Sequence, residues 1–145
     1  MPQIDKTALV PVSAKTMFAV VNDVESYPQF VDGCRASRVL QQSNTHMVAE
    51  IEVSKGGFTQ AFTTRNQLTE NEIIELKLQS GPFKYLTGKW HFIALDDHAC
   101  KVVFHLDFEF NSKVLALAFN RVFSKIAEAM LQAFVQRAKQ LGSGA

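Results

Sequence analysis

Apolar and polar positions alternate with a period of two in several consecutive segments, which is the pattern of half-buried β-strands. The alternation is clearest over residues 100–110, where the even-numbered residues are apolar. The same pattern predicts strands over residues 3–10, from Arg35 onward, and over 47–54, 58–68, 74–79 and 83–95. The facing of the 83–95 segment is ambiguous near Gly88, where a β-bulge is one explanation. Short turns such as Gly56-Gly57 and Gly81-Pro82 separate the strands and predict an antiparallel meander.

Helical periodicity flanks the strands. Ser13 is a good N-cap for a short helix from Ala14 to about Asn22, and a second short helix or turn is predicted around Tyr27 to Val31. After residues 111–112 the apolar period becomes 3.6 and predicts one long C-terminal helix. Gly142 is expected to end it, which leaves residues 142–145 as a loose tail. Strands grouped together and helices grouped apart indicate an α+β fold in which residues 1–145 form one domain.

A long helix packed on about seven strands has a geometric consequence. Such a sheet is roughly 34 Å wide and a helix only about 10–12 Å across, so the sheet must curl around the helix. The apolar faces of both would then line the space between them, with Phe58, Phe62, Phe104, Phe108 and Phe110 from the strands and Phe119, Phe123, Met130 and Phe134 from the helix. Two interpretations stay open: these side chains fill a core, or they surround a pocket for a hydrophobic ligand.

The mouth of such a pocket is expected where the covering segment is least regular. Pro28 lacks an amide hydrogen and interrupts regular pairing in residues 23–31, and the Gly81-Pro82 turn could lie beside that segment. Tyr27, Phe30 and Phe83 are therefore predicted to form a hinged lid at the pocket mouth. The alternative is that they merely plug the open end of the curled sheet.

Composition and charge narrow the classes of partner. The chain has 145 residues and a net charge of +1, so no overall basic field would draw it to DNA. Phenylalanine accounts for 12 aromatic residues, beside two Tyr and one Trp, which suits an apolar interior. Cys34 and Cys100 form no CxxC pair and predict free thiols. The first residues lack the pattern of a secretory signal, and no apolar run approaches the roughly 18 residues of a transmembrane helix, so we expect a soluble cytoplasmic protein.

Motifs for catalysis or metal binding are not found in the sequence. It contains no glycine-rich phosphate loop and no GxSxG or HExxH motif, and His46, His91, His98 and His105 are scattered. The carboxylates at positions 107 and 109 share the face opposite the aromatic residues, where solvation or salt bridges explain them better than acid–base catalysis. The predicted inward residues are almost all apolar, so an enzyme of the cyclase type is disfavoured. We expect no metal and no required cofactor.

Five segments taken together resemble one protein family. They are Asn22–Phe30, Phe62–Asn66, Gly81–Phe83, Gly88–Phe92 and Asp107–Phe110. In this order they are similar to the RatA family of bacterial ribosome association toxins and its mitochondrial relatives, the coenzyme Q-binding proteins. That family belongs to the START-like, helix-grip superfamily, which also holds polyketide cyclases and lipid carriers. The chain departs from many members before Cys34, where Asp32-Gly33 stands in place of a Pro-Trp pair.

The resemblance implies a helix-grip fold and two alternative functions. The main hypothesis is a non-enzymatic carrier that holds a ubiquinone-like polyprenyl lipid in its cavity, supports respiration and is peripheral to the inner membrane. The alternative is a toxin that binds the large ribosomal subunit, blocks subunit association and so inhibits translation initiation, with a small antitoxin protein as a further partner. For the toxin, Lys55, Lys84, Arg121 and Lys125 are the candidate contacts with rRNA phosphates.

Overall fold

The computed structural model describes residues 3–143, and over this range it contains one sheet of seven strands. The strands are β1 (Gln3–Val10), β2 (Cys34–Gln42), β3 (His46–Lys55), β4 (Phe58–Thr69), β5 (Ile73–Ser80), β6 (Phe83–Asp96) and β7 (Ala99–Phe110). All neighbouring strands are antiparallel, in the order β1-β7-β6-β5-β4-β3-β2. Strands β2 to β7 therefore form the predicted meander, and β1 pairs with the last strand, β7.

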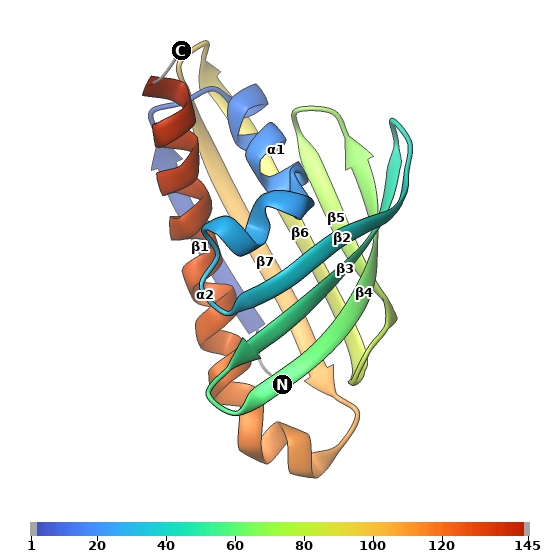
Figure 1. The fold of residues 1–145 in the computed structure, drawn as a ribbon. Coiled ribbons are helices and arrows are strands. Elements are labelled where there is room, and N and C mark those ends of the chain that lie inside the picture. The colour runs from blue at the N-terminus through green and yellow to red at the C-terminus, as the bar shows by residue number, and fades with distance from the viewer. Residues whose placement is uncertain (1–2, 144–145) are drawn as a thin grey trace.

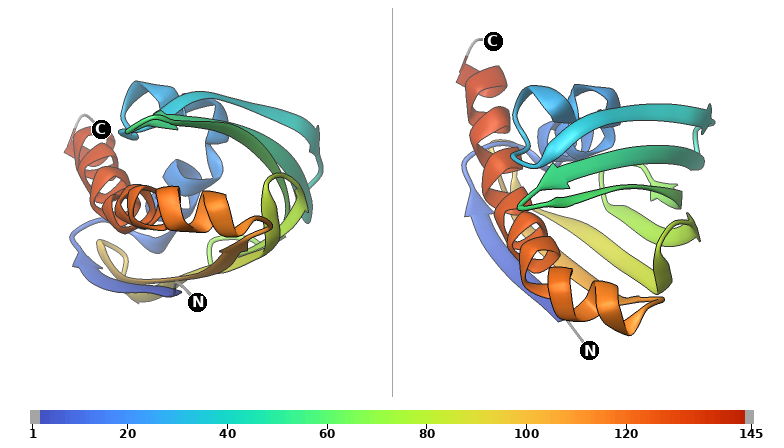
Figure 2. Two further views of the ribbon diagram at one scale, coloured as in Figure 1. Left: turned by 90° about the horizontal axis from the view of Figure 1, so that it is seen from below. Right: turned by 60° about the horizontal axis from the view of Figure 1, so that its bottom comes forward.

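The long helix α2 (Lys113–Ser143) lies against the concave face of the sheet. Seen from below, the strands form an incomplete ring around this helix (Figure 2). The short helix α1 (Ala14–Asn22) and the 3₁₀ helix η1 (Val24–Gln29) cover part of the open side, between α2 and the edge strand β2 (Figure 1). The fold is thus the α+β, helix-grip arrangement that the patterning and the resemblance predict.

Both α-helices begin at capping serines. The Ser13 hydroxyl oxygen accepts a hydrogen bond from the Thr16 amide at 3.1 Å, and the Ser112 hydroxyl oxygen accepts one from the Leu115 amide at 3.3 Å. Amides of a first helical turn have no partner within the helix, so these hydroxyls stabilise both helix starts. The beginnings of α1 and α2 lie where the sequence predicts them.

Two helix boundaries differ from the prediction. The segment expected around Tyr27 to Val31 is η1, which begins at Val24 because the Ser26 amide donates to the Asp23 carbonyl at 3.2 Å. The expectation that Gly142 ends the last helix is wrong, since α2 continues through Ser143. One glycine weakens a helix by only about 1 kcal/mol, and the last turns of α2 are held by the buried Ala138. Residues 144–145 of the expected tail lie outside the described residues.

Gly88 marks a close approach of side chains, and the β-bulge considered there is not found. The pairing of β6 with β7 is regular at Gly88, which faces Leu106, and its irregularities lie nearer the two ends of β6. A Cβ atom at Gly88 would lie 3.0 Å from a methyl carbon of Leu106 and 3.2 Å from one of Leu76. The missing side chain therefore leaves room for two leucines from the neighbouring strands.

Aromatic side chains fill the interior near the beginning of α2. Phe83 stacks on Phe110 with 4.8 Å between ring centroids and lies 5.2 Å from Phe123 of the helix. Phe58 lies 5.0 Å from Phe119, one turn earlier in α2. At this end of the molecule the phenylalanines form a packed core.

Candidate functional site

A cavity lies between the middle of α2 and the sheet. Its volume is about 80 Å³. Residues from α1, η1 and strands β3 to β7 form most of its wall, and Phe123, Ile126 and Met130 of α2 close it on the other side. Pockets for drug-sized ligands usually measure about 300–1,000 Å³. A ligand larger than a small ring would therefore have to displace side chains.

Four of the nine residues predicted to surround a pocket lie on the cavity wall, namely Phe62, Phe104, Phe123 and Met130. Phe58, Phe108, Phe110 and Phe119 pack instead into the aromatic core, as their short distances to other rings show. Phe134 lies between Tyr27 and Trp90, at 5.0 and 5.2 Å. Strand alternation tells which face a residue occupies, but not whether that part of the face is filled, so the pattern could not separate the two groups.

The cavity has a polar side that the predicted inward residues did not include. Asn22, Thr64 and Asn66 all contribute to its wall. The Thr64 hydroxyl donates to the Asn66 side-chain oxygen at 2.8 Å, whereas the buried side-chain oxygen of Asn22 has no hydrogen-bond partner among the described residues. The expectation of an almost wholly apolar interior is therefore corrected. Strand alternation could have predicted this polar side, since Thr64 and Asn66 are even-numbered residues of β4 and share the inward face of Phe62.

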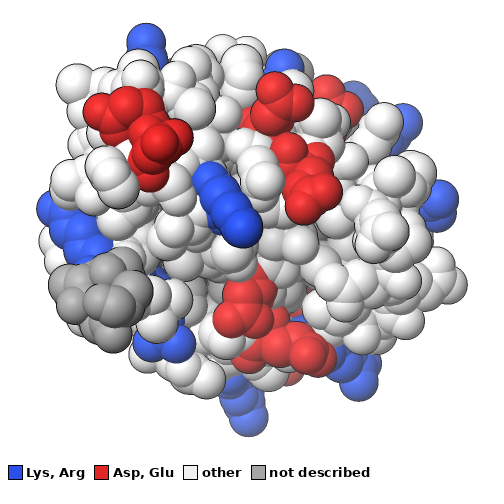
Figure 3. All heavy atoms as spheres, turned by 90° about the horizontal axis from the view of Figure 1, so that it is seen from above, with Lys and Arg blue, Asp and Glu red and all other residues white. Residues whose placement is uncertain are grey.

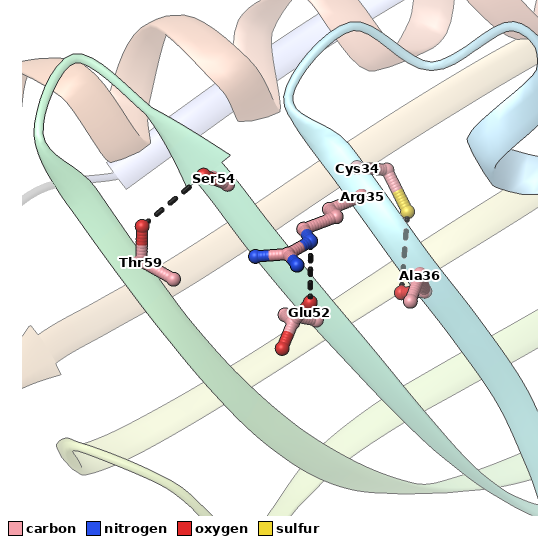
Figure 4. A network of polar contacts seen from close by, with 6 residues as sticks. All are labelled: Cys34, Arg35, Ala36, Glu52, Ser54 and Thr59. Carbon is pink, nitrogen blue, oxygen red and sulfur yellow. Dashed lines mark hydrogen bonds and ion pairs between the residues drawn. The ribbon is translucent and has the colours of Figure 1, made fainter.

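Tyr27 and Cys34, which also line the cavity, keep their protons at neutral pH. Burial, followed by the nearby Cys34 and Asp23, raises the pKa of Tyr27, whose hydroxyl donates to the Val21 carbonyl. Burial raises the pKa of Cys34 to about 11, although a hydrogen bond with Ser37 acts in the opposite direction. The thiol points toward the Ala36 carbonyl at 3.7 Å (Figure 4). A protonated thiol is a weak nucleophile, so this side of the cavity suits binding better than acid–base or covalent chemistry.

The three residues predicted for the pocket mouth do not lie together. Tyr27 and Phe30 are neighbours at 6.2 Å and both contact Phe134. Phe83 begins β6 and belongs to the aromatic core described above, so it packs behind Phe62 and Phe123 of the cavity wall and does not line the cavity itself. Phe83 lies there because the pairing of β6 with β7 places it opposite Phe110, at the end of the sheet near the start of α2. A lid at the mouth would therefore consist of η1 with Tyr27 and Phe30.

The four predicted ribosome contacts divide into two kinds. Lys55 forms an ion pair with Asp32, and Lys84 lies 3.6 Å from a carboxylate oxygen of Glu109. Arg121 and Lys125 are exposed on α2, and no salt bridge involves them within the part of the chain that the structure describes. On the face seen from above, basic and acidic residues are interspersed (Figure 3). That face therefore carries no extended basic surface.

A groove on the outer face of the sheet carries a group of unpaired cations. Arg65 of β4, Lys77 of β5 and Lys89 of β6 line it, together with Glu75 and His105. Arg65 and Lys77 are directly opposite each other in the pairing of β4 with β5. None of the three cations takes part in a salt bridge among the described residues. Like charges placed directly opposite on a sheet are destabilising, so this arrangement suits a bound anion.

The remaining candidate groups are placed on the outside. His105 on β7 pairs with Asp5 of β1 at 2.6 Å on the outer face, as strand alternation predicts for its side. Among residues 3–143, no group of three or more His, Cys, Asp or Glu side chains is arranged to hold a metal ion. Over the same residues, no helix is both long and apolar enough to cross a lipid bilayer.

Comparison with known sequences shows that the chain is similar to proteins named ribosome association toxins. It is 54% identical over 143 residues to the ribosome association toxin RatA of Escherichia coli, which covers 99% of this chain and 90% of the relative. The RatA protein of Pseudomonas aeruginosa is 44% identical and covers 95% of this chain and 96% of the relative. The mitochondrial coenzyme Q-binding protein COQ10 of Drosophila melanogaster is 29% identical, over 93% of this chain and 57% of its own length.

Solved structures share the fold. The Zhui aromatase/cyclase from Streptomyces superposes with a TM-score of 0.84 over 96% of this chain and 94% of its own, at 18% identity. The protein CC1736 from Caulobacter crescentus has a TM-score of 0.77 at 29% identity and covers the whole of both chains. The family model described as polyketide cyclase/dehydrase and lipid transport matches residues 10–135. The chain therefore belongs to this START-like family, in the group that contains the RatA toxins and the coenzyme Q-binding proteins.

Proposed function

We propose that this protein associates with the ribosome and inhibits translation. The observation that carries the proposal is the 54% identity to a ribosome association toxin over 99% of the chain. In its specific form, the protein binds the large subunit and blocks joining of the small one, and a small antitoxin protein is its natural counterpart. This order of functions reverses the expectation drawn from the sequence, because the toxin relatives are much more similar to this chain than the coenzyme Q-binding protein is.

The groove on the outer sheet face supports a phosphate-binding role in this association. Arg65 and Lys77 repel each other across the strands, and one phosphate between them would relieve the repulsion. Lys55 and Lys84, in contrast, already have carboxylate partners and would have to exchange them for phosphates. We therefore propose the rRNA contact first at Arg65 and Lys77, since Lys89 lies directly opposite Glu75 in the pairing of β5 with β6.

Sucrose-gradient sedimentation with purified subunits tests this function. At low salt the protein is expected to sediment with the large subunit and to increase the fraction of free subunits. The variant R65E/K77E should bind more weakly, and the magnitude of the slope of log affinity against log salt concentration should fall by about one, because the phosphate shared by the two cations is lost. Lys101→Glu, an exposed position of β7 outside the groove, is the matched control. Failure of the unchanged protein to sediment with the large subunit would contradict the proposal.

A second candidate function is the binding of an amphipathic ligand in the cavity. The observation that favours it is the Asn22 side-chain oxygen, which is buried in the cavity wall without a partner among the described residues. An unsatisfied buried acceptor costs about 1–3 kcal/mol, and a ligand hydroxyl would supply the missing donor. The reduced, quinol form of a ubiquinone-like lipid has such hydroxyls on an otherwise apolar molecule. Its polyprenyl tail would require the wall to open, because the cavity is small.

Binding without catalysis is part of this second proposal, since Tyr27 and Cys34 both hold their protons at neutral pH. Organic extraction of protein purified from quinone-replete cells, followed by titration with a short-chain quinol, is the direct measurement. Recovery of no quinone or other lipid, together with no binding of the added quinol, would exclude the ligand class.

A further inference from the structure

The first turns of α2 expose large apolar side chains to solvent. Leu117 is 92% exposed and Val114 is 76% exposed, the two highest values among the exposed large hydrophobic residues of the described chain. They lie three residues apart and so share one face of the helix. The opposite face of the same turns holds the partly buried Phe119 and the buried Phe123, which pack on the sheet. Core packing therefore does not explain Val114 and Leu117.

Charge near these two residues is of one sign. Between positions 113 and 127 the ionisable side chains are Lys113, Arg121 and Lys125, and Glu128 is the first carboxylate of the helix. None of the three cations forms a salt bridge within residues 3–143. The carboxylate before the helix, Glu109, already pairs with Lys84. The exposed apolar pair is thus surrounded by unpaired positive charge.

This part of α2 also lies at an extremity of the molecule. Its first turns project beyond the lower end of the sheet in Figure 1, and the right-hand view of Figure 2 shows them at the bottom. The β3–β4 turn lies alongside, where a Cβ atom at Gly56 would be 3.3 Å from Val122. A projecting tip can approach a flat surface without obstruction by the sheet.

We propose that residues 113–125 dock on an anionic lipid bilayer. Val114 and Leu117 enter the interface, where amphipathic helices bury their apolar face by about 5–10 Å. Arg121 and Lys125 follow Leu117 on the same face, about 6 and 12 Å further along the helix axis. With the tip inserted at an angle to the bilayer, these two cations lie at the level of the lipid phosphates. An RNA backbone would satisfy the cations but would leave both apolar side chains in water, whereas an anionic bilayer satisfies both. The proposal goes beyond both functions proposed above and requires neither.

Flotation with vesicles tests the proposal directly. The protein is expected to float with vesicles of phosphatidylcholine and phosphatidylglycerol at low salt, and much less with phosphatidylcholine alone. V114S/L117S should weaken partitioning about tenfold or more. R121E/K125E should weaken it by at least about fivefold for each residue, since each basic residue contributes about that factor at an anionic surface. The matched control is L9S/K101E, an exposed leucine and lysine that face each other across β1 and β7. All these positions are exposed, so the melting temperature should not change.

Three results would overturn the proposal. The first is no flotation of the unchanged protein with the anionic vesicles. The second is equal loss of flotation in the control and in the two α2 variants. The third is unchanged flotation of V114S/L117S. If the same variant no longer sediments with the ribosome, the tip of α2 binds the ribosome; if it no longer forms a dimer that the unchanged protein forms, the tip binds a second copy of the chain. Ribosome binding is measured on the same variants, so a failure of the proposed ribosome function can be distinguished from a failure of membrane docking.

Discussion

At the scale of single residues, Asn22 links stability to ligand binding. Its side-chain oxygen is buried in the cavity wall without a partner among the described residues, whereas the nearby Asn66 oxygen accepts from Thr64. Natural sequences rarely leave a buried acceptor unpaired unless another function requires it. Asn22, at the end of α1, would therefore increase the affinity for a ligand while it lowers the free energy of unfolding.

Asn22→Leu is expected to raise the free energy of unfolding by about 1 kcal/mol, because it removes an unsatisfied buried oxygen and the larger side chain can extend into the adjacent cavity. The same change should weaken binding of a short-chain quinol about tenfold, since a hydrogen bond to the ligand is lost. Urea denaturation and calorimetric titration measure the two effects. Asn120→Leu is the control, because its side-chain oxygen is also buried and unpaired but lies outside the cavity wall. Equal quinol affinity in both variants would refute the role of Asn22.

At the scale of elements, the β5–β6 turn is held against the cavity wall by a glycine. Gly81 has a φ of 149°, and a Cβ atom there would lie 2.6 Å from Cβ of Phe62. Phe62 belongs to the cavity wall and also contacts Phe83, which follows the turn. The turn residues thus set how closely β6 can approach the inward side chains of β4.

Gly81→Ala should destabilise the protein by about 2–3 kcal/mol, since it combines backbone strain with a clash against Phe62. Gly57→Ala is the control for strain alone, because Gly57 has a φ of 83° but a Cβ atom there would meet no side chain or backbone beyond its chain neighbours within 4 Å. Thermal and urea unfolding compare the two. Equal losses would show that the contact with Phe62 contributes nothing.

At the scale of the whole molecule, the candidate functions occupy different sides of the sheet. The cavity lies inside the curl, the cationic groove with Arg65 and Lys77 lies outside, and the start of α2 forms one tip. Entry to the cavity requires one covering element to move. Helix η1 is short, and it is tied to β2 by a 2.6 Å hydrogen bond from the Ser37 hydroxyl to the Val24 carbonyl. Because η1 is the shortest element of the cavity wall, we predict that it is the lid, with Tyr27 and Phe30, and that opening breaks this hydrogen bond.

Hydrogen exchange over residues 23–33, with and without a short-chain quinol, tests the lid. Protection in this segment is expected to rise on binding because Tyr27 and Phe30 would be fixed over the ligand. Residues 40–42, the exposed end of the edge strand β2, lie outside the cavity wall and exchange by local opening, so they are the internal reference and should not change. If the complex forms and the protection of residues 23–33 does not change, η1 is not a lid and only closes the open end of the curled sheet.

Much of the fold is determined by local patterns in the sequence. Period-two alternation predicts the strands, because one face of each strand is buried, and Ser13 and Ser112 predict the helix starts through their capping bonds. The need for a wide sheet to curl around one helix follows from their dimensions. The five resemblance segments identify the family, and the comparisons confirm it.

Only the tertiary structure decided where the interior is filled and where it is hollow. Phe58 and Phe62 share one face of one strand, yet the first packs on Phe119 and the second borders the cavity. That difference depends on the distance between α2 and each part of the curved sheet, which no local pattern encodes. The pairing of Phe83 with Phe110, and of Arg65 with Lys77, likewise depends on strand register. Alternation gives each residue a face, whereas neighbours on that face come from segments far apart in the sequence.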